Sequence, residues 1–229
     1  MKIQGLQKMT LLDFPGRVAC TVFLGGCDFR CPFCHNGELL DGSAPAVMDD
    51  AELLRFLKGR RGLLDGVAIT GGEPLLRKDL PELLKAIREL GFAVKVDTNG
   101  NHPYALEGLL RERLVDYVAM DIKNSPEKYA LTVGLKELDL APIRRSVTLL
   151  MESSIPYEFR TTVVDELHKA EDFAAMGRWI AGAKAYFLQP FTDRDSVPFA
   201  GLHAPTRENL EKYASIAKVY VPYTAIRGV

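Results

Sequence analysis

The chain has 229 residues, of which 47% are hydrophobic and 26% charged, which is typical of a globular protein and excludes a disordered or fibrous one. Its formal net charge of −1 disfavours a broad polyanion-binding surface, so nucleic acid is a poor candidate as a partner. The sequence lacks both an apolar run of the ~18 residues that a membrane span needs and the apolar stretch of a signal peptide. We therefore expect a cytoplasmic protein without membrane association.

Short runs of β-branched and apolar residues recur along the chain and predict buried strands. They cover residues 18–24, 67–70, 92–96, 115–120, 158–164 and 185–188, with a weaker seventh run at 219–221. Amphipathic runs between them predict helices, and most carry a start signal. These start signals are Asp49-Asp50, Pro81, Pro103, Pro142 and Pro205. A further predicted helix contains Phe173, Met176 and Ile180.

Six strand–helix units in succession predict a parallel sheet with right-handed crossovers in one domain that covers residues 1–229. Six units are too few for an eight-fold barrel of ~250 residues, which leaves a partial, open (βα)6 barrel or a doubly wound sheet. Both architectures place their chemistry beyond the carboxyl ends of the strands.

All four cysteines lie within fifteen residues, and three of them follow the first predicted strand as Cys27, Cys31 and Cys34. This clustering indicates a metal or cluster site rather than a disulfide framework. Cys20 lies inside the strand and is interpreted as a small core residue. His35 directly follows Cys34, and adjacent side chains diverge too far to bind one metal easily.

Ordinary iron–sulfur clusters use four cysteines, so three ligands predict a four-iron cluster with one open iron that can bind a substrate. A zinc knuckle is the structural alternative. The spacing of the three cysteines, with aromatic Phe33 before the last one, resembles the signature of the radical S-adenosylmethionine superfamily.

Three polar segments follow successive predicted strands, where the barrel rule places functional residues. Gly71-Gly72-Glu73-Pro74 resembles the superfamily segment that binds the methionine amino group, although alone it is equally consistent with a turn. Asp97-Thr98-Asn99-Gly100 contains a turn signal, and Asp97 is placed to bind a ribose hydroxyl. In Asp121-Ile122-Lys123, alternation puts Asp121 and Lys123 on one side, where they form either a salt bridge or a carboxylate-binding site.

The fifth and sixth strands supply two weaker candidates. Arg160 and Thr162 share one face of their strand, and Arg160 can bind a carboxylate or stack on a base. Gln189-Pro190-Phe191 ends the next strand and could border an adenine. Structural roles are equally compatible with both.

Taken together, these motifs resemble the glycyl radical enzyme activases, and in particular the activating proteins of anaerobic ribonucleoside-triphosphate reductase. The opening segment 5–17 and the segment from Phe23 to Asn36 extend the resemblance, which covers nearly the whole chain and is strongest over residues 1–125. It implies a radical S-adenosylmethionine type of partial barrel with a 4Fe-4S cluster on Cys27, Cys31 and Cys34. The residues assigned to S-adenosylmethionine are Phe33, Gly71, Gly72, Glu73, Pro74, Asp97, Asn99, Asp121, Lys123, Arg160 and Gln189.

The resemblance further implies a one-electron donor such as flavodoxin or ferredoxin, and cleavage of S-adenosylmethionine to a 5′-deoxyadenosyl radical that abstracts hydrogen from a glycine of a partner enzyme. Two other functions stay open: a radical enzyme that acts on a small molecule or RNA, and a non-catalytic iron–sulfur or zinc protein. The last explains the cysteines but leaves Glu73, Asp97, Asp121 and Lys123 without a common purpose.

Overall fold

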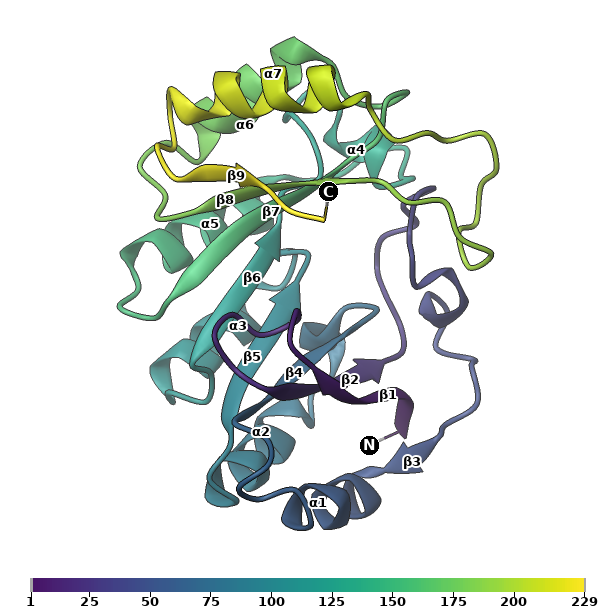
Figure 1. Ribbon diagram of the computed structural model, residues 1–229, viewed down its shortest axis with the longest axis vertical. Coiled ribbons are helices and arrows are strands. Elements are labelled where there is room, and N and C mark those ends of the chain that lie inside the picture. Colours follow the sequence, from purple (N-terminus) through teal and green to yellow (C-terminus); the bar gives the residue numbers. More distant parts are fainter. Residues whose placement is uncertain (1, 229) are drawn as a thin grey trace.

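A curved sheet with helices along its outer side forms the body of the molecule in the computed structural model, which describes residues 2–228 (Figure 1). The strands are β1 (Lys2–Thr10), β2 (Ala19–Leu24), β3 (Met48–Asp49), β4 (Gly66–Gly71), β5 (Ala93–Thr98), β6 (Tyr117–Asp121), β7 (Tyr157–Val163), β8 (Tyr186–Pro190) and β9 (Thr224–Ile226). The helices are α1 (Asp50–Lys58), α2 (Leu80–Glu89), α3 (Pro103–Arg111), α4 (Tyr129–Thr132), α5 (Ala141–Glu152), α6 (Ala170–Trp179) and α7 (Arg207–Lys218), with short 3-10 helices η1 (Gly37–Leu39) and η2 (Pro74–Leu76).

The sheet order is β3-β1-β2-β4-β5-β6-β7-β8-β9, and every pairing from β2 to β9 is parallel. Strand β1 is antiparallel to both of its neighbours, β2 and β3. The sheet curves without joining β3 to β9, so the fold is the partial, open barrel of the α/β class that the sequence predicts. None of the helices within residues 2–228 is both long and apolar enough to cross a bilayer.

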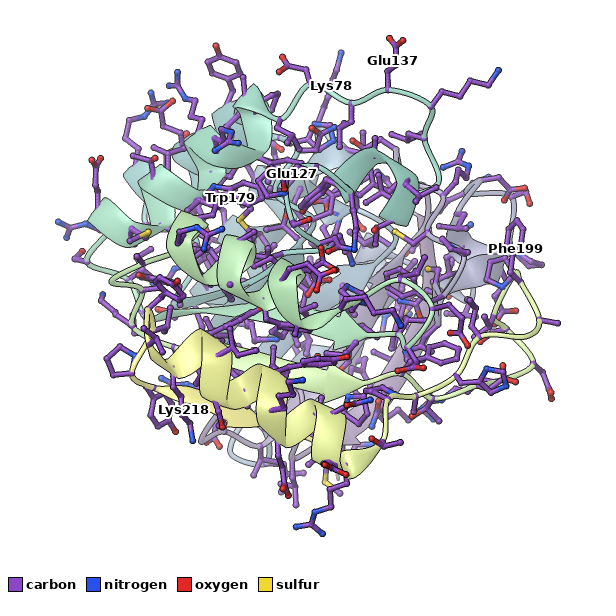
Figure 2. The ribbon with its side chains drawn as sticks, turned by 90° about the horizontal axis from the view of Figure 1, so that it is seen from above. Lys78, Glu127, Glu137, Trp179, Phe199 and Lys218 are labelled. Carbon is purple, nitrogen blue, oxygen red and sulfur yellow. The ribbon has the colours of Figure 1, made fainter. Side chains whose placement is uncertain are left out.

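Strands β2, β4 and β6 are nearly continuous apolar runs, whereas β5 and β7 interpose the charged residues Lys95, Asp97, Glu158 and Arg160. Helix α2 shows the matching helical pattern, since it buries Leu80, Leu83, Leu84 and Ile87 along one side. Asp49 caps α1 as predicted, because its carboxylate accepts a hydrogen bond from the backbone N–H of Glu52 at 2.9 Å. Helices α6 and α7 lie side by side (Figures 1 and 2) and are joined by the stacked rings of Phe173 and Tyr213, 4.4 Å apart.

Two elements differ from the sequence prediction. The strand expected at 219–221 is wrong: these residues follow the end of α7, with Val219 77% exposed, and the strand forms at Thr224–Ile226 against Tyr186–Leu188. Strand β1 was not predicted as a strand, because it is mostly polar and exposed or half-buried beside the edge of the sheet, and its large apolar residues, Ile3, Leu6 and Met9, do not alternate with polar ones. A run of β-branched and aromatic residues thus identifies a central strand more reliably than an outer one.

The carboxyl ends of the parallel strands continue into the longest connections of the chain. The segment from Gly25 to Val47 lies on the side of the sheet away from the helices, and the segment after β8 approaches it there (Figure 1). His35 joins the two, since its Nε2 lies 2.8 Å from the carbonyl oxygen of Thr192 and its ring stacks on Phe191. This arrangement sets the cysteine loop over the strand ends.

Candidate functional site

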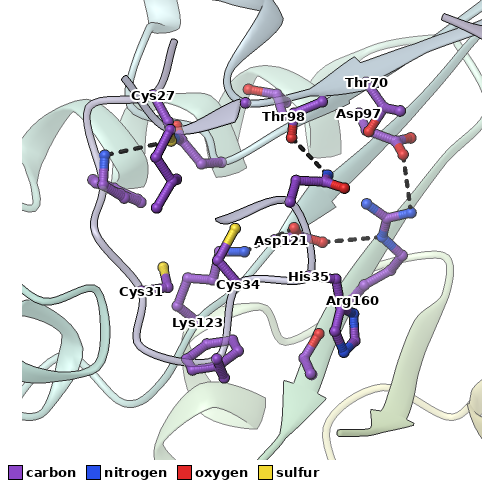
Figure 3. A pocket seen from close by; sticks show the side chains of 18 of the residues that line it. Cys27, Cys31, Cys34, His35, Thr70, Asp97, Thr98, Asp121, Lys123 and Arg160 are labelled. Carbon is purple, nitrogen blue, oxygen red and sulfur yellow. Dashed lines mark hydrogen bonds and ion pairs between the residues drawn. The ribbon is translucent and has the colours of Figure 1, made fainter. Parts of the chain in front are cut away.

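A cavity of about 220 Å³ opens at the carboxyl ends of β4 to β8, beneath the cysteine loop (Figure 3). It is lined by Cys27, Phe29, Cys31, Phe33, Cys34, His35, Asn36, Leu40, Thr70, Gly71, Gly72, Asp97, Thr98, Asn99, Asp121, Lys123, Arg160, Thr162 and Gln189. Thus every predicted site residue except Glu73 and Pro74 lines one cavity. We call the part that carries the three cysteines the thiol wall, and the part formed by Asp97, Asp121, Lys123 and Arg160 the charged wall.

The thiol wall contains Cys27, Cys31 and Cys34, whereas Cys20 is fully buried in β2 and does not line the cavity. Within residues 2–228, no three histidine, cysteine, aspartate or glutamate side chains gather closely enough to hold a single metal ion. Three thiols on one wall of a cavity fit the donor set of an iron–sulfur cluster, in which each iron takes its own thiol.

Backbone hydrogen bonds fix the cysteine loop. The N–H groups of Gly26 and Cys27 donate to the carbonyls of Leu39 and Leu40 at 2.8 and 2.9 Å. The strand end of β4 lies directly behind, since a Cβ on Gly72 would stand 2.1 Å from the carbonyl oxygen of Gly26. The absence of a side chain at Gly72 is therefore required for the loop to reach the strand end.

The thiols are neutral as the chain stands. Burial raises the pKa of Cys27 to about 11 and that of Cys31 to about 12, and it also raises the pKa of Cys34. The ammonium of Lys123 opposes the rise at all three positions, and Figure 3 shows its side chain beside Cys34. Metal binding at these cysteines must release protons, and Lys123 favours that release electrostatically.

The charged wall alternates acids and bases across three strand ends. Lys123 Nζ lies 2.9 Å from Asp121, and Arg160 reaches Asp121 at 3.0 Å and Asp97 at 3.4 Å (Figure 3). Burial alone would raise the pKa of Asp121, but Arg160 and Lys123 outweigh it and hold that pKa at about 2. Asp97, which also accepts from buried Lys95, has its pKa lowered by Arg160 and Lys95 against the effect of burial. Both carboxylates are therefore ionised at neutral pH.

The Gly-Gly-Glu-Pro segment is divided between the cavity and the core. Gly71 and Gly72 line the cavity, whereas Glu73 is 1% exposed beneath it and Pro74 is buried in η2. The carboxylate of Glu73 accepts hydrogen bonds from the N–H of Leu75 at 3.0 Å, the hydroxyl of Thr98 at 2.9 Å and the N–H of Asn99 at 2.6 Å. We expected this carboxylate to face a bound ammonium, but in the structure it joins the end of β4 to the end of β5.

A polar network that the sequence does not predict holds the thiol wall from the other side. Asp28, next to Cys27, accepts hydrogen bonds from the amides of Asn99 and Asn101 at 2.8 and 2.6 Å, and its carboxylate lies 3.1 Å from Nε2 of His102. Burial opposes ionisation of Asp28, but His102 and the two amides keep its pKa at about 2. No local sequence pattern predicts this network, because its members come from two loops about seventy residues apart.

Comparison with known proteins gives the family. The model of the radical SAM superfamily matches residues 21–179. The chain is 30% identical, over 99% of its length and 96% of the relative, to a Methanocaldococcus jannaschii protein whose name assigns it to the glycyl-radical enzyme activating enzymes. It is 33% identical to the pyruvate formate-lyase-activating enzyme of Clostridium pasteurianum over 54% of this chain and 52% of that protein.

A solved structure confirms the fold. Streptococcus suis SuiB bound to S-adenosylmethionine aligns with a TM-score of 0.68 at 13% identity, over 91% of this chain and 52% of that one. The three thiols on one cavity wall fit the cluster that is characteristic of the matched family. The chain thus belongs to the radical SAM superfamily, as an enzyme that uses a 4Fe-4S cluster and S-adenosylmethionine.

Proposed function

We propose that this enzyme is a glycyl radical enzyme activase whose partner is an anaerobic ribonucleotide reductase. The observation that carries the activase assignment is the near end-to-end similarity to a protein named as such an activating enzyme. The reductase is supported by the sequence resemblance, including the opening segment 5–17, which forms most of β1 and its turn into β2. A flavodoxin or ferredoxin serves as the electron donor.

In this proposal, the two walls of the cavity hold the two cofactors. Cys27, Cys31 and Cys34 ligate three irons of the cluster and leave the fourth open. When bound, the cluster supplies the electron that cleaves S-adenosylmethionine reductively to methionine and a 5′-deoxyadenosyl radical. Lys123 binds the methionine carboxylate, because its ammonium faces the cavity beside the thiol wall.

The remaining cavity residues bind other parts of S-adenosylmethionine. The backbone carbonyls of Gly71 and Gly72 accept hydrogen bonds from the methionine ammonium, because they line the cavity, whereas the carboxylate of Glu73 is buried and already accepts from three donors. Asp97 binds the ribose hydroxyls. Arg160 holds it in place and is itself held by Asp121. Phe33, Asn99 and Gln189 border the ligand, and Gln189 lies at the strand end where the adenine is expected.

The chain's own contribution is to orient the ligand and to exclude water. Its charged wall is paired before any ligand arrives, so little rearrangement is needed on binding. The sheet is not closed between β3 and β9, and a loop of the partner protein enters the cavity from that side. Because the partner closes the site, we expect slow and unproductive cleavage of S-adenosylmethionine by the enzyme alone.

The test is anaerobic incubation of the reconstituted enzyme with S-adenosylmethionine, a reductant and an anaerobic ribonucleotide reductase. We expect a glycyl radical by electron paramagnetic resonance, with roughly one 5′-deoxyadenosine for each radical formed when water is excluded from the complex. A reductase whose radical glycine is replaced by alanine is the control and gains no such signal. Rapid multiple turnover driven by a small molecule, with no response from any glycyl radical enzyme, would contradict the proposal.

A further inference from the structure

The segment that carries Lys123 is irregular, yet it is held as firmly as a strand. After β6 ends at Asp121, the chain continues without regular structure through Asn124 and Ser125, which are 0% and 2% exposed. Successive backbone carbonyls of this segment accept hydrogen bonds from side chains of other elements. The hydroxyl of Thr161 in β7 donates to the carbonyl of Ile122 at 2.6 Å.

The next carbonyl, that of Lys123 itself, lies 2.9 Å from Nε2 of His168. His168 follows β7 on the loop before α6 and is 0% exposed. Its complete burial excludes a surface role for this histidine. Its ring lies beside Phe173 in the core.

The surroundings of His168 select one form of the ring. The carbonyl of Lys123 can only accept a hydrogen bond, so Nε2 must carry the hydrogen. The backbone N–H of Val164 then donates to Nδ1 at 3.1 Å. Nδ1 also lies 3.1 Å from the carbonyl oxygen of Val164, but that oxygen already accepts from the backbone N–H groups of Leu167 and His168. The opposite tautomer would place the Nε2 lone pair against the carbonyl oxygen of Lys123 and leave the N–H of Val164 without this acceptor, so the balance of contacts favours the Nε2–H form.

We propose that His168 is a positioning residue for Lys123, holding its backbone so that the ammonium reaches the methionine carboxylate of S-adenosylmethionine. This inference rests on the proposed role of Lys123. A lysine side chain is flexible, and here Asp121 restrains its far end while His168 restrains its near end. Loss of the near restraint frees the loop without touching the ligand.

Two variants and two ligands test the inference. His168→Leu removes both ring nitrogens, whereas His168→Gln retains an amide N–H that can reach the carbonyl of Lys123. The ligands are S-adenosylmethionine and 5′-methylthioadenosine, which lacks the amino acid part. Affinities are measured anaerobically by calorimetry on the reconstituted proteins, at matched iron content.

We expect His168→Leu to weaken the binding of S-adenosylmethionine about tenfold, which corresponds to the loss of one buried hydrogen bond. The affinity for 5′-methylthioadenosine should stay unchanged. His168→Gln should recover most of the affinity. An equal loss for both ligands would assign His168 a structural role only and overturn the inference, as would unchanged affinity for both in His168→Leu.

Lys123→Met separates this inference from the proposed function. This variant should bind S-adenosylmethionine more weakly, and combining it with His168→Leu should cause no further loss of affinity. If Lys123→Met leaves the affinity unchanged, the role of Lys123 fails. If Lys123→Met weakens binding while His168→Leu does not, only the positioning role fails. Nitrogen-15 resonance of the iron-free wild-type protein should show the Nε2–H tautomer, and the Nδ1–H tautomer would overturn the inference even if His168→Leu does not fold.

Discussion

The thiol wall and the charged wall of the cavity are built in opposite ways. The thiol wall is one short stretch of sequence, fixed by backbone hydrogen bonds and a glycine contact, and its ionisable groups stay neutral until metal binds. The charged wall is assembled from the ends of β5, β6 and β7, and its groups are ionised and paired already. One wall is completed by its cofactor, whereas the other is complete in the folded chain.

The largest expected effect comes from removing a cysteine of the thiol wall. Cys27→Ala, Cys31→Ala and Cys34→Ala should each abolish the cluster, because each removes one of only three thiolate ligands. Iron analysis after anaerobic reconstitution checks this, with about four irons expected per wild-type chain. Cys20→Ala is the matched control and should retain its iron. A comparable loss of iron in Cys20→Ala would contradict the ligand assignment.

The next largest effect comes from removing the arginine of the charged wall. Arg160→Met leaves the partly buried carboxylates of Asp97 and Asp121 without their shared partner, each keeping one lysine, so we expect a loss of about 1.5–3 kcal/mol in the free energy of unfolding. Denaturant unfolding of the iron-free protein measures it. Arg145→Met, which removes a half-exposed partner of Glu107, is the control and should change stability by about 0.5 kcal/mol or less. Equal effects of the two variants would show that the wall is not preorganised by charge.

A third effect concerns Glu73, the carboxylate between the walls. Burial raises its pKa from 4.5 to about 7, so between these values the folded state holds a proton that the unfolded state has released. The free energy of unfolding should therefore fall as pH rises through this window, by at most ~1.4 kcal/mol per pH unit. Glu73→Gln lacks this dependence, so the stability of the wild type should fall relative to that of Glu73→Gln as pH rises toward 7. Parallel curves would mean that the pKa of Glu73 is not raised.

The smallest effect tests the contact between β4 and the thiol wall. Gly72→Ala forces the carbonyl of Gly26 to move and should destabilise the iron-free protein by about 1–3 kcal/mol. Gly108→Ala, in α3 with open space around its Cβ, should stabilise it by about 0.5–1 kcal/mol. Thermal unfolding of both variants compares them. A neutral Gly72→Ala would show that the loop does not depend on this close approach.

The sequence predicts what is local and periodic. The cysteine spacing indicates the thiol wall directly, and strand alternation places Asp121 and Lys123 on one side, as the structure shows. It could not place the network around Asp28 or the carbonyl contact of His168, since both join loops that are distant in sequence. The position of Glu73 was missed for a related reason: its three hydrogen-bond donors lie on the two segments that follow β4 and β5, and their convergence appears only in the folded chain.

The central claim is that both walls bind one molecule of S-adenosylmethionine, and calorimetry on the wild-type protein with and without iron tests it most directly. The charged wall is already formed in the iron-free chain, so that chain should bind S-adenosylmethionine weakly. Reconstitution should tighten binding by at least about tenfold, because a cluster held by the three cysteines would offer an iron to the methionine end of the ligand. Equal affinity of the iron-free and reconstituted proteins would contradict the account.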